Sequence, residues 1–158
     1  TETKIMQFRY WTELSNLLGA TNSKLKPQAP RPQHWYNFSI GRSGIKITAL
    51  INTRENRIGV ELRMTSEDTS KAFFYLLMED KENIEKEIGT ELLWKELSEQ
   101  TVSRIILYKS VNPMDEANWP EQHKWFKSTI EKLDQIFRKR VRELNPEDWD
   151  GEPISLDS

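Results

Sequence analysis

Residues 35 to 64 contain the pattern that most constrains the fold of this chain. In two segments, apolar residues alternate with other residues. In the first, Lys46, Thr48 and Leu50 alternate with Ile45, Ile47, Ala49 and Ile51. In the second, Gly59, Glu61 and Arg63 alternate with Ile58, Val60, Leu62 and Met64. A period of two is typical of strands that bury one face. We therefore predict three antiparallel strands with one apolar and one polar face. The turn Gly41-Arg42-Ser43-Gly44 joins the first two strands and places Arg42 at an exposed tip.

Apolar residues at helical spacing surround this meander. They predict three main helices, over residues 4 to 18, 67 to 88 and 118 to 144. In the first helix the apolar stripe, taken as core, contains Ile5, Phe8, Trp11, Leu14 and Leu18. Two short apolar segments, at 92 to 97 and 102 to 109, predict further strands.

The predicted order of elements is α-β-β-β-α-β-β-α. It indicates an α+β fold in which the three-strand meander is extended to a five-strand sheet. We expect one domain over residues 1 to 144, followed by an acidic, flexible tail over residues 145 to 158.

Composition excludes several classes of site. The chain has no cysteine, so disulfides, zinc-cysteine sites and thiol catalysis are excluded, and its two histidines lack the spacing of a metal motif. The net charge of -2 is not that of a strongly basic nucleic-acid binder, so any such contact requires a local patch. No apolar run approaches the roughly 20 residues of a membrane span. We expect a cytoplasmic protein with no membrane contact and no cofactor.

Six cations form the candidate patch. Three lie on or beside the polar strand face (Arg42, Lys46 and Arg63), and three lie in the proline-containing loop before it (Lys24, Lys26 and Arg31). Cations neutralise phosphates, and Trp35, with Asn37 as its neighbour, offers an aromatic ring for stacking on a base. The alternative is that Trp35 packs under the first helix, that the strand charges only solvate the sheet, and that the loop is a linker.

Several short motifs resemble those of a known family. They are Gly41-x-x-Gly44, Val60-Glu61-Leu62, Lys71-x-Phe73-Phe74-x-x-Leu77, Lys81-x-x-Ile84-Glu85-x-x-Ile88-Gly89, Leu93-Trp94, and a last helix containing Trp125 and Phe137. Over about residues 5 to 144 the chain is similar to an uncharacterised bacterial and archaeal domain of unknown function, which often lies C-terminal to nuclease-like domains. The resemblance implies an association with nucleic-acid-processing and defence-type proteins. It implies no catalytic residues.

A nuclease is one alternative, because the order of elements also matches the core of restriction-endonuclease-like enzymes. In those enzymes an acid on the second strand and Glu-x-Lys on the third bind magnesium. Glu61-x-Arg63 lies at the corresponding place here, but the second strand has no acid and arginine does not release its proton. The simpler interpretation is an exposed ion pair, so we name no catalytic or metal-binding residues.

A protein-interaction or dimerisation domain is the other alternative. The chain has six tryptophans, among them Trp119, Trp125 and Trp149, and tryptophan is enriched at interfaces. The function we expect is a non-catalytic accessory module with weak, sequence-independent contact to nucleic acid. Its expected partners are nucleic acid or a nuclease-like domain, and the sequence leaves its oligomeric state open.

Overall fold

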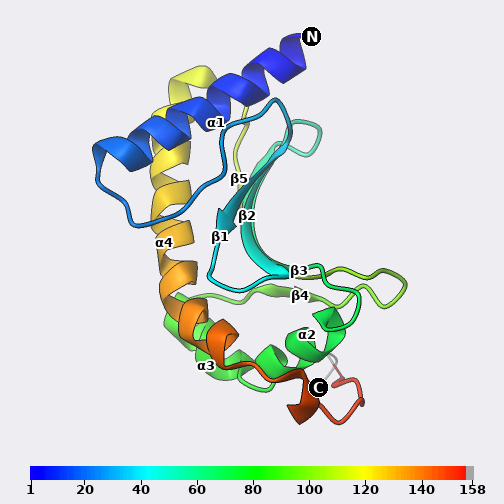
Figure 1. Cartoon of the computed structure of the whole chain (residues 1–158). Helices are drawn as coiled ribbons and strands as arrows, with labels where there is room; N and C mark the ends of the chain where they lie inside the picture. Colours follow the sequence, from blue (N-terminus) through cyan, green and yellow to red (C-terminus); the bar gives the residue numbers. More distant parts are fainter. Residues whose placement is uncertain (156–158) are drawn as a thin grey trace.

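The period-two segments form the centre of a five-stranded antiparallel sheet in the computed structural model, which describes residues 1–155 (Figure 1). The strands are β1 (Trp35–Ser39), β2 (Ile45–Asn52), β3 (Arg57–Met64), β4 (Leu93–Lys95) and β5 (Ser103–Ser110). They lie side by side in the order β1-β2-β3-β5-β4. The predicted α+β fold with a five-strand sheet is confirmed.

The register keeps the apolar residues of neighbouring strands on one face. Ile47 pairs with Leu62, and Leu62 pairs with Ile105. All three side chains are buried. Because side chains alternate along a strand, the residues between them point to the opposite face. We call the apolar side the inner face and the other side the outer face.

Helices lie on the inner face of the sheet and at its lower end in Figure 1. They are α1 (Glu2–Ala20), α2 (Ser70–Met78), α3 (Lys81–Ile88) and α4 (Trp119–Glu143), with short 3-10 turns at η1 (Glu116–Asn118) and η2 (Pro146–Asp148). Tyr10 and Trp11 of α1 are buried in the core. The Trp11 ring stacks on the ring of Tyr36 in β1, with the two ring centroids 5.3 Å apart. No helix of the described residues combines the length and apolar character needed to cross a membrane.

The helix predicted over residues 67 to 88 is two helices. It is interrupted at Glu79 and Asp80, between α2 and α3. The break has a packing reason, because Phe74 of α2 lies against Trp94 of the sheet, whereas α3, whose buried residues are Ile84 and Ile88, packs against α4. One straight helix would not direct both apolar stripes toward these two surfaces.

The core stripe predicted for the first helix is partly wrong. Ile5 is 62% exposed and Phe8 is 48% exposed, while Met6 and Tyr10 are buried in addition to the expected Trp11. The tertiary packing of α1 against α4 selects which residues of the aromatic-rich helix turn inward.

The segment after α4 lies against α2. Trp149 stacks on Tyr75 with ring centroids 5.4 Å apart, and its Nε1 donates to the carbonyl of Glu152 at 3.1 Å. This contact involves part of the acidic tail predicted over residues 145 to 158. Residues 156 to 158 of that tail lie outside the described residues.

Candidate functional site

The outer face carries no helix in the described part of the chain, and it brings cations together from across the whole sheet. Lys46 pairs with Arg63 across β2 and β3, Arg63 pairs with Arg104 across β3 and β5, and Arg104 pairs with Lys95 across β5 and β4. Paired residues of an antiparallel sheet share a face. These four cations therefore form a line perpendicular to the strands.

The loop before β1 adds a fifth cation to this line. Pro27 forms a β-bridge with Phe38, Ser39 donates its N–H to the carbonyl of Lys26 at 3.0 Å, and Gln28 donates its N–H to the carbonyl of Asn37 at 2.9 Å. Alternation places Lys26 next to Ser39 on the outer face. We call the set Lys26, Lys46, Arg63, Arg104 and Lys95 the cationic row.

Trp35 lies on the outer face, not under α1. Its neighbour Tyr36 points inward and is fully buried, whereas Trp35 is 38% exposed and has the ring of His34 at 4.8 Å in an edge arrangement. The alternative that Trp35 belongs to the core below the first helix is therefore wrong. An exposed indole on a polar sheet face remains available to a ligand.

Glu61 and Arg63 do not form the exposed ion pair that the sequence predicts. The Glu61 side chain is only 1% exposed, and its Oε2 accepts a hydrogen bond from Arg104 Nε at 2.5 Å. Arg63 Nη1 is 3.8 Å from Oε1, which is beyond hydrogen-bond distance. No donor among the described residues bonds to Oε1. The carboxylate is buried because it lies in the middle strand, between two guanidinium groups.

The floor of the outer face beside Glu61 is polar. Thr48 Oγ1 donates to Asn37 Oδ1 at 2.7 Å, and Asn37 Nδ2 donates to Gln28 Oε1 at 3.4 Å. A hollow of about 400 Å³ lies over this floor. It is lined by His34, Trp35, Asn37, Lys46, Thr48, Leu50, Glu61, Arg63 and Thr65. One concavity thus holds an exposed indole, two cations and several hydrogen-bonding groups.

A second hollow, of about 530 Å³, continues from the first toward the edge of β1. Lys26, Ser39 and Lys46 are among the residues that line it. The two concavities share Asn37 and Lys46, and between them they are bordered by Lys26, Lys46 and Arg63 of the cationic row.

Tyr108 lies on the outer face beside Gly59, on the far side from the cationic row. A Cβ atom added at Gly59 would lie 2.6 Å from Tyr108 Cδ1, so the Tyr108 ring lies directly over the glycine. The guanidinium of Arg57 is 3.9 Å from the centroid of the same ring. Tyr108 is only partly exposed, so Trp35, at 38% exposed, is the more open of these two aromatic side chains on the outer face.

Arg42 is not at an exposed tip. Its Nη1 donates to the carbonyls of Val141 at 2.9 Å and Leu144 at 2.5 Å, and its guanidinium lies 4.5 Å from the centroid of the Phe73 ring. The last carbonyls of a helix have no partner within the helix, so a guanidinium at that end satisfies them. The structure thus gives Arg42 a contact at the C-terminal end of α4.

Lys24 and Arg31 are exposed in the loop before β1, outside the paired segment around Pro27. Of the six predicted cations, Lys26, Lys46 and Arg63 therefore belong to the cationic row. Arg104 and Lys95 were missed, because they lie in short apolar segments where no period of two marks a polar face.

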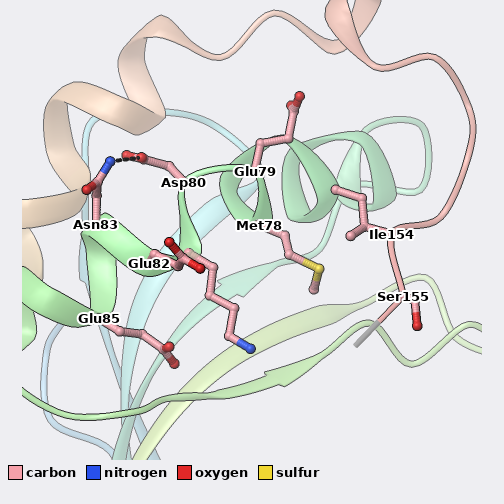
Figure 2. A pocket seen from close by; sticks show the side chains of 9 residues that line it. Met78, Glu79, Asp80, Glu82, Asn83, Glu85, Ile154 and Ser155 are labelled. Carbon is pink, nitrogen blue, oxygen red and sulfur yellow. Dashed lines mark hydrogen bonds between the residues drawn. The ribbon is translucent and has the colours of Figure 1, made fainter. Parts of the chain in front are cut away.

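An acidic hollow of about 460 Å³ lies where α2 meets α3 (Figure 2). Two of its carboxylates, those of Asp80 and Glu85, already have partners in the fold. Asp80 accepts hydrogen bonds from Asn83 Nδ2 at 2.7 Å and Arg140 Nε at 2.9 Å, and Glu85 accepts from the N–H of Leu92 at 2.7 Å. These bonds give Asp80 and Glu85 structural roles.

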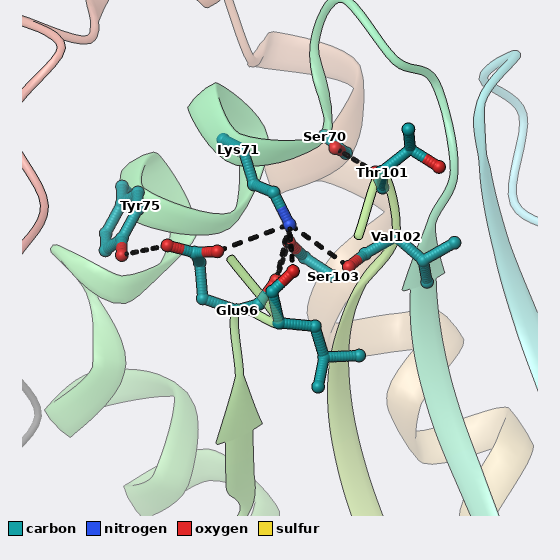
Figure 3. Close-up of polar contacts among 8 residues, drawn as sticks. Ser70, Lys71, Tyr75, Glu96, Thr101, Val102 and Ser103 are labelled. Atoms are coloured by element: carbon teal, nitrogen blue, oxygen red, sulfur yellow. Dashed lines mark hydrogen bonds and ion pairs between the residues drawn. The ribbon is translucent and has the colours of Figure 1, made fainter. Parts of the chain in front are cut away.

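A partly buried polar cluster around Lys71 holds the β4–β5 connection in place (Figure 3). Lys71 Nζ donates to the carbonyls of Glu96 at 2.5 Å and Val102 at 3.1 Å, and to Ser103 Oγ at 3.0 Å. The Glu96 carboxylate also accepts from Tyr75. A serine beside a lysine suggests nucleophilic catalysis, but Ser103 is fully buried and the ammonium protons are all directed at acceptors. The cluster is structural.

A comparison with known families shows where the chain belongs. The model described as Domain of unknown function (DUF4268) matches residues 6–141. The chain belongs to this family. The match confirms the resemblance to a domain of unknown function and covers nearly the same residues. The DUF4268 description assigns no activity, and no curated protein or solved structure matches the chain.

The nuclease alternative finds little support at Glu61. Within residues 1–155, no three histidine, aspartate or glutamate side chains are grouped so as to bind a metal ion. The Glu61 carboxylate faces Arg104 and Arg63 rather than a second carboxylate, and two adjacent positive charges disfavour a divalent cation. In this DUF4268 chain the strongest candidate site is the outer face, with the cationic row and Trp35.

Proposed function

We propose that the outer face is a nucleic-acid-binding surface and that the chain is a non-catalytic accessory module. The observation that carries this proposal is the cationic row, which extends from Lys26 beside β1 to Lys95 on β4. Cations spaced along a line suit a polyanion, because each can neutralise one phosphate. Phosphate contacts position a strand without reading its sequence.

Binding through this surface is weak. Glu61 cancels part of the positive charge at the centre of the row, through its contacts with Arg104 and Arg63. The whole chain is mildly acidic, with a formal net charge of -2, so it lacks long-range attraction for a polyanion. A module of this kind gains affinity when it is joined to another nucleic-acid-binding domain.

The partner we propose is a nuclease-type domain. This part of the proposal rests on the family resemblance, which implies a position beside nucleic-acid-processing and defence proteins. The module would hold the substrate while its partner performs the chemistry. The outer face fits such a role, since it offers cations, an exposed indole and polar side chains.

The salt dependence of binding tests the proposal. Fluorescence anisotropy with labelled DNA should show that log affinity falls with log salt at a slope of roughly -3.5 to -4.5, as expected for about five phosphates. Replacing both Lys46 and Arg63 by glutamine should make the slope shallower by roughly 1.5 to 2 and weaken binding equally across sequences.

A matched control removes the same two charges elsewhere. Lys139 and Arg142 are exposed near the end of α4, which packs on the inner face. Their double replacement by glutamine should leave the slope almost unchanged. If both double variants weaken binding equally, the cationic row is not the contact. If the parent binds no DNA or RNA at low salt, the proposal is wrong and a protein-interaction domain becomes preferable.

A further inference from the structure

We infer that the ligand of the outer face is a single strand of nucleic acid that crosses the β-strands, with about four nucleotides in contact and one base stacked on Trp35. This inference rests on the proposed function. It adds the class of nucleic acid, the direction of the strand and the length of the site.

The direction follows from the register. The positions of the row are linked by pairing from Lys26 through Ser39, Lys46, Arg63 and Arg104 to Lys95. The row is therefore perpendicular to the β-strands, and with strands roughly 4.8 Å apart it is about 24 Å long. A row of that length accommodates about four nucleotides of an extended strand, at the lower end of known single-strand site sizes.

The preference for a single strand follows from Trp35. This side chain lines the same hollow of about 400 Å³ as Lys46 and Arg63, so an indole and two phosphate-neutralising groups border one concavity. The volume lies in the range of sites for small ligands, which suits one nucleotide. The bases of a duplex are paired and stacked on each other, so they have no free face for the indole.

The surroundings of Trp35 leave a stacking surface free. The rings of Trp35 and His34 are nearly perpendicular, at an interplanar angle of 75°, so His34 does not stack flat on the indole, and Trp35 is 38% exposed. Along β1, Asn37 lies on the same side and offers polar groups at the floor of the hollow. Stacking on an aromatic ring tolerates any base, which agrees with the sequence-independent contact proposed above.

Anisotropy titrations with labelled oligothymidylates of about two to ten nucleotides, and with duplexes of the longest length, test the inference. Affinity per site should rise up to about four nucleotides and then level off. The single strand should bind at least about tenfold more tightly than the duplex, because each stacked base contributes a factor of about 5 to 150.

Variants at Trp35 separate stacking from charge. Trp35→Ala should weaken single-strand binding by about 5- to 150-fold and change duplex binding by less than about twofold, while Trp35→Phe should restore most of the loss. Phe8→Ala is the control, since this exposed ring lies on α1, away from the outer face. Thermal melts of each variant establish that it is folded.

Equal affinity for single strand and duplex, or unchanged single-strand binding in folded Trp35→Ala, would overturn the inference. In both cases the cationic row would still bind nucleic acid, so the proposed function would stand. The absence of any binding by the parent would instead reject the proposed function, and the inference with it.

Discussion

Glu61 and Arg104 form an ion pair at the centre of the outer face, although 43 positions separate them in the chain. The Oε2 and Nε atoms are 2.5 Å apart. Burial lowers the pKa of the Arg104 guanidinium, but the hydrogen bond and charge of Glu61, with a smaller contribution from Tyr108, outweigh burial and hold that pKa above its ordinary value. The pair links the third strand to the fifth and anchors the middle of the cationic row.

Arg104→Gln should therefore destabilise the fold. The substitution leaves the buried Glu61 carboxylate with Arg63 alone, at 3.8 Å. Breaking one side of a buried pair costs about 3 kcal/mol. Urea denaturation would measure the loss in the free energy of unfolding. Combining Arg104→Gln with Glu61→Gln should cost less than the sum of the single losses, and strict additivity would contradict a coupled pair.

Arg42→Gln should also destabilise the fold, but it should not change the affinity for nucleic acid. The variant loses the bonds to the carbonyls of Val141 and Leu144 and the contact with Phe73, so we expect a loss of about 1 to 3 kcal/mol in the free energy of unfolding. Arg31→Gln, in the exposed loop, is the stability control. A marked fall in the DNA affinity of folded Arg42→Gln would show that Arg42 does contact phosphate.

His123 should make the fold sensitive to acid. Burial among Tyr10 and Trp119 lowers its pKa from 6.5 to about 4, against a smaller raising effect of the Tyr10 backbone. The unfolded chain therefore takes up the proton first, so stability is lost as the pH falls from about 6.5 toward about 4, by about 3 kcal/mol in total.

Carboxylates also titrate in this range, so the measurement is a comparison with His123→Phe. The free energy of unfolding of this variant, which cannot take up the proton, should depend less on pH. Parallel pH profiles for the two proteins would show that His123 does not contribute.

Gly59→Ala should destabilise the fold by displacing the Tyr108 ring on the outer face. Its Cβ would meet Tyr108 Cδ1 at 2.6 Å, and displacing the ring would also move it away from Arg57. Overpacking of this kind costs about 1 to 3 kcal/mol. Thermal unfolding would measure the loss, and adding Tyr108→Ala should recover part of it. If the double variant is no more stable than Gly59→Ala alone, the steric explanation is wrong.

The strands and their faces could be predicted from the sequence because alternation in β2 and β3 carries that information residue by residue. Ile47 and Leu62 had to face one side, so Lys46 and Arg63 had to face the other. The family could also be identified from local motifs. These predictions needed no knowledge of how distant segments meet.

The tertiary structure alone decided which cations form a line and which side chains are covered. Arg104 lies in an apolar run without alternation, and its place beside Arg63 depends on the register of β5 against β3. Arg42 occupies a hairpin that looks exposed locally, yet the end of α4 lies within its reach. The alternation in β3 predicts that the Glu61 side chain is exposed. Its burial arises from neighbours on other strands, because contacts between distant segments are set by packing of the whole core rather than by local sequence.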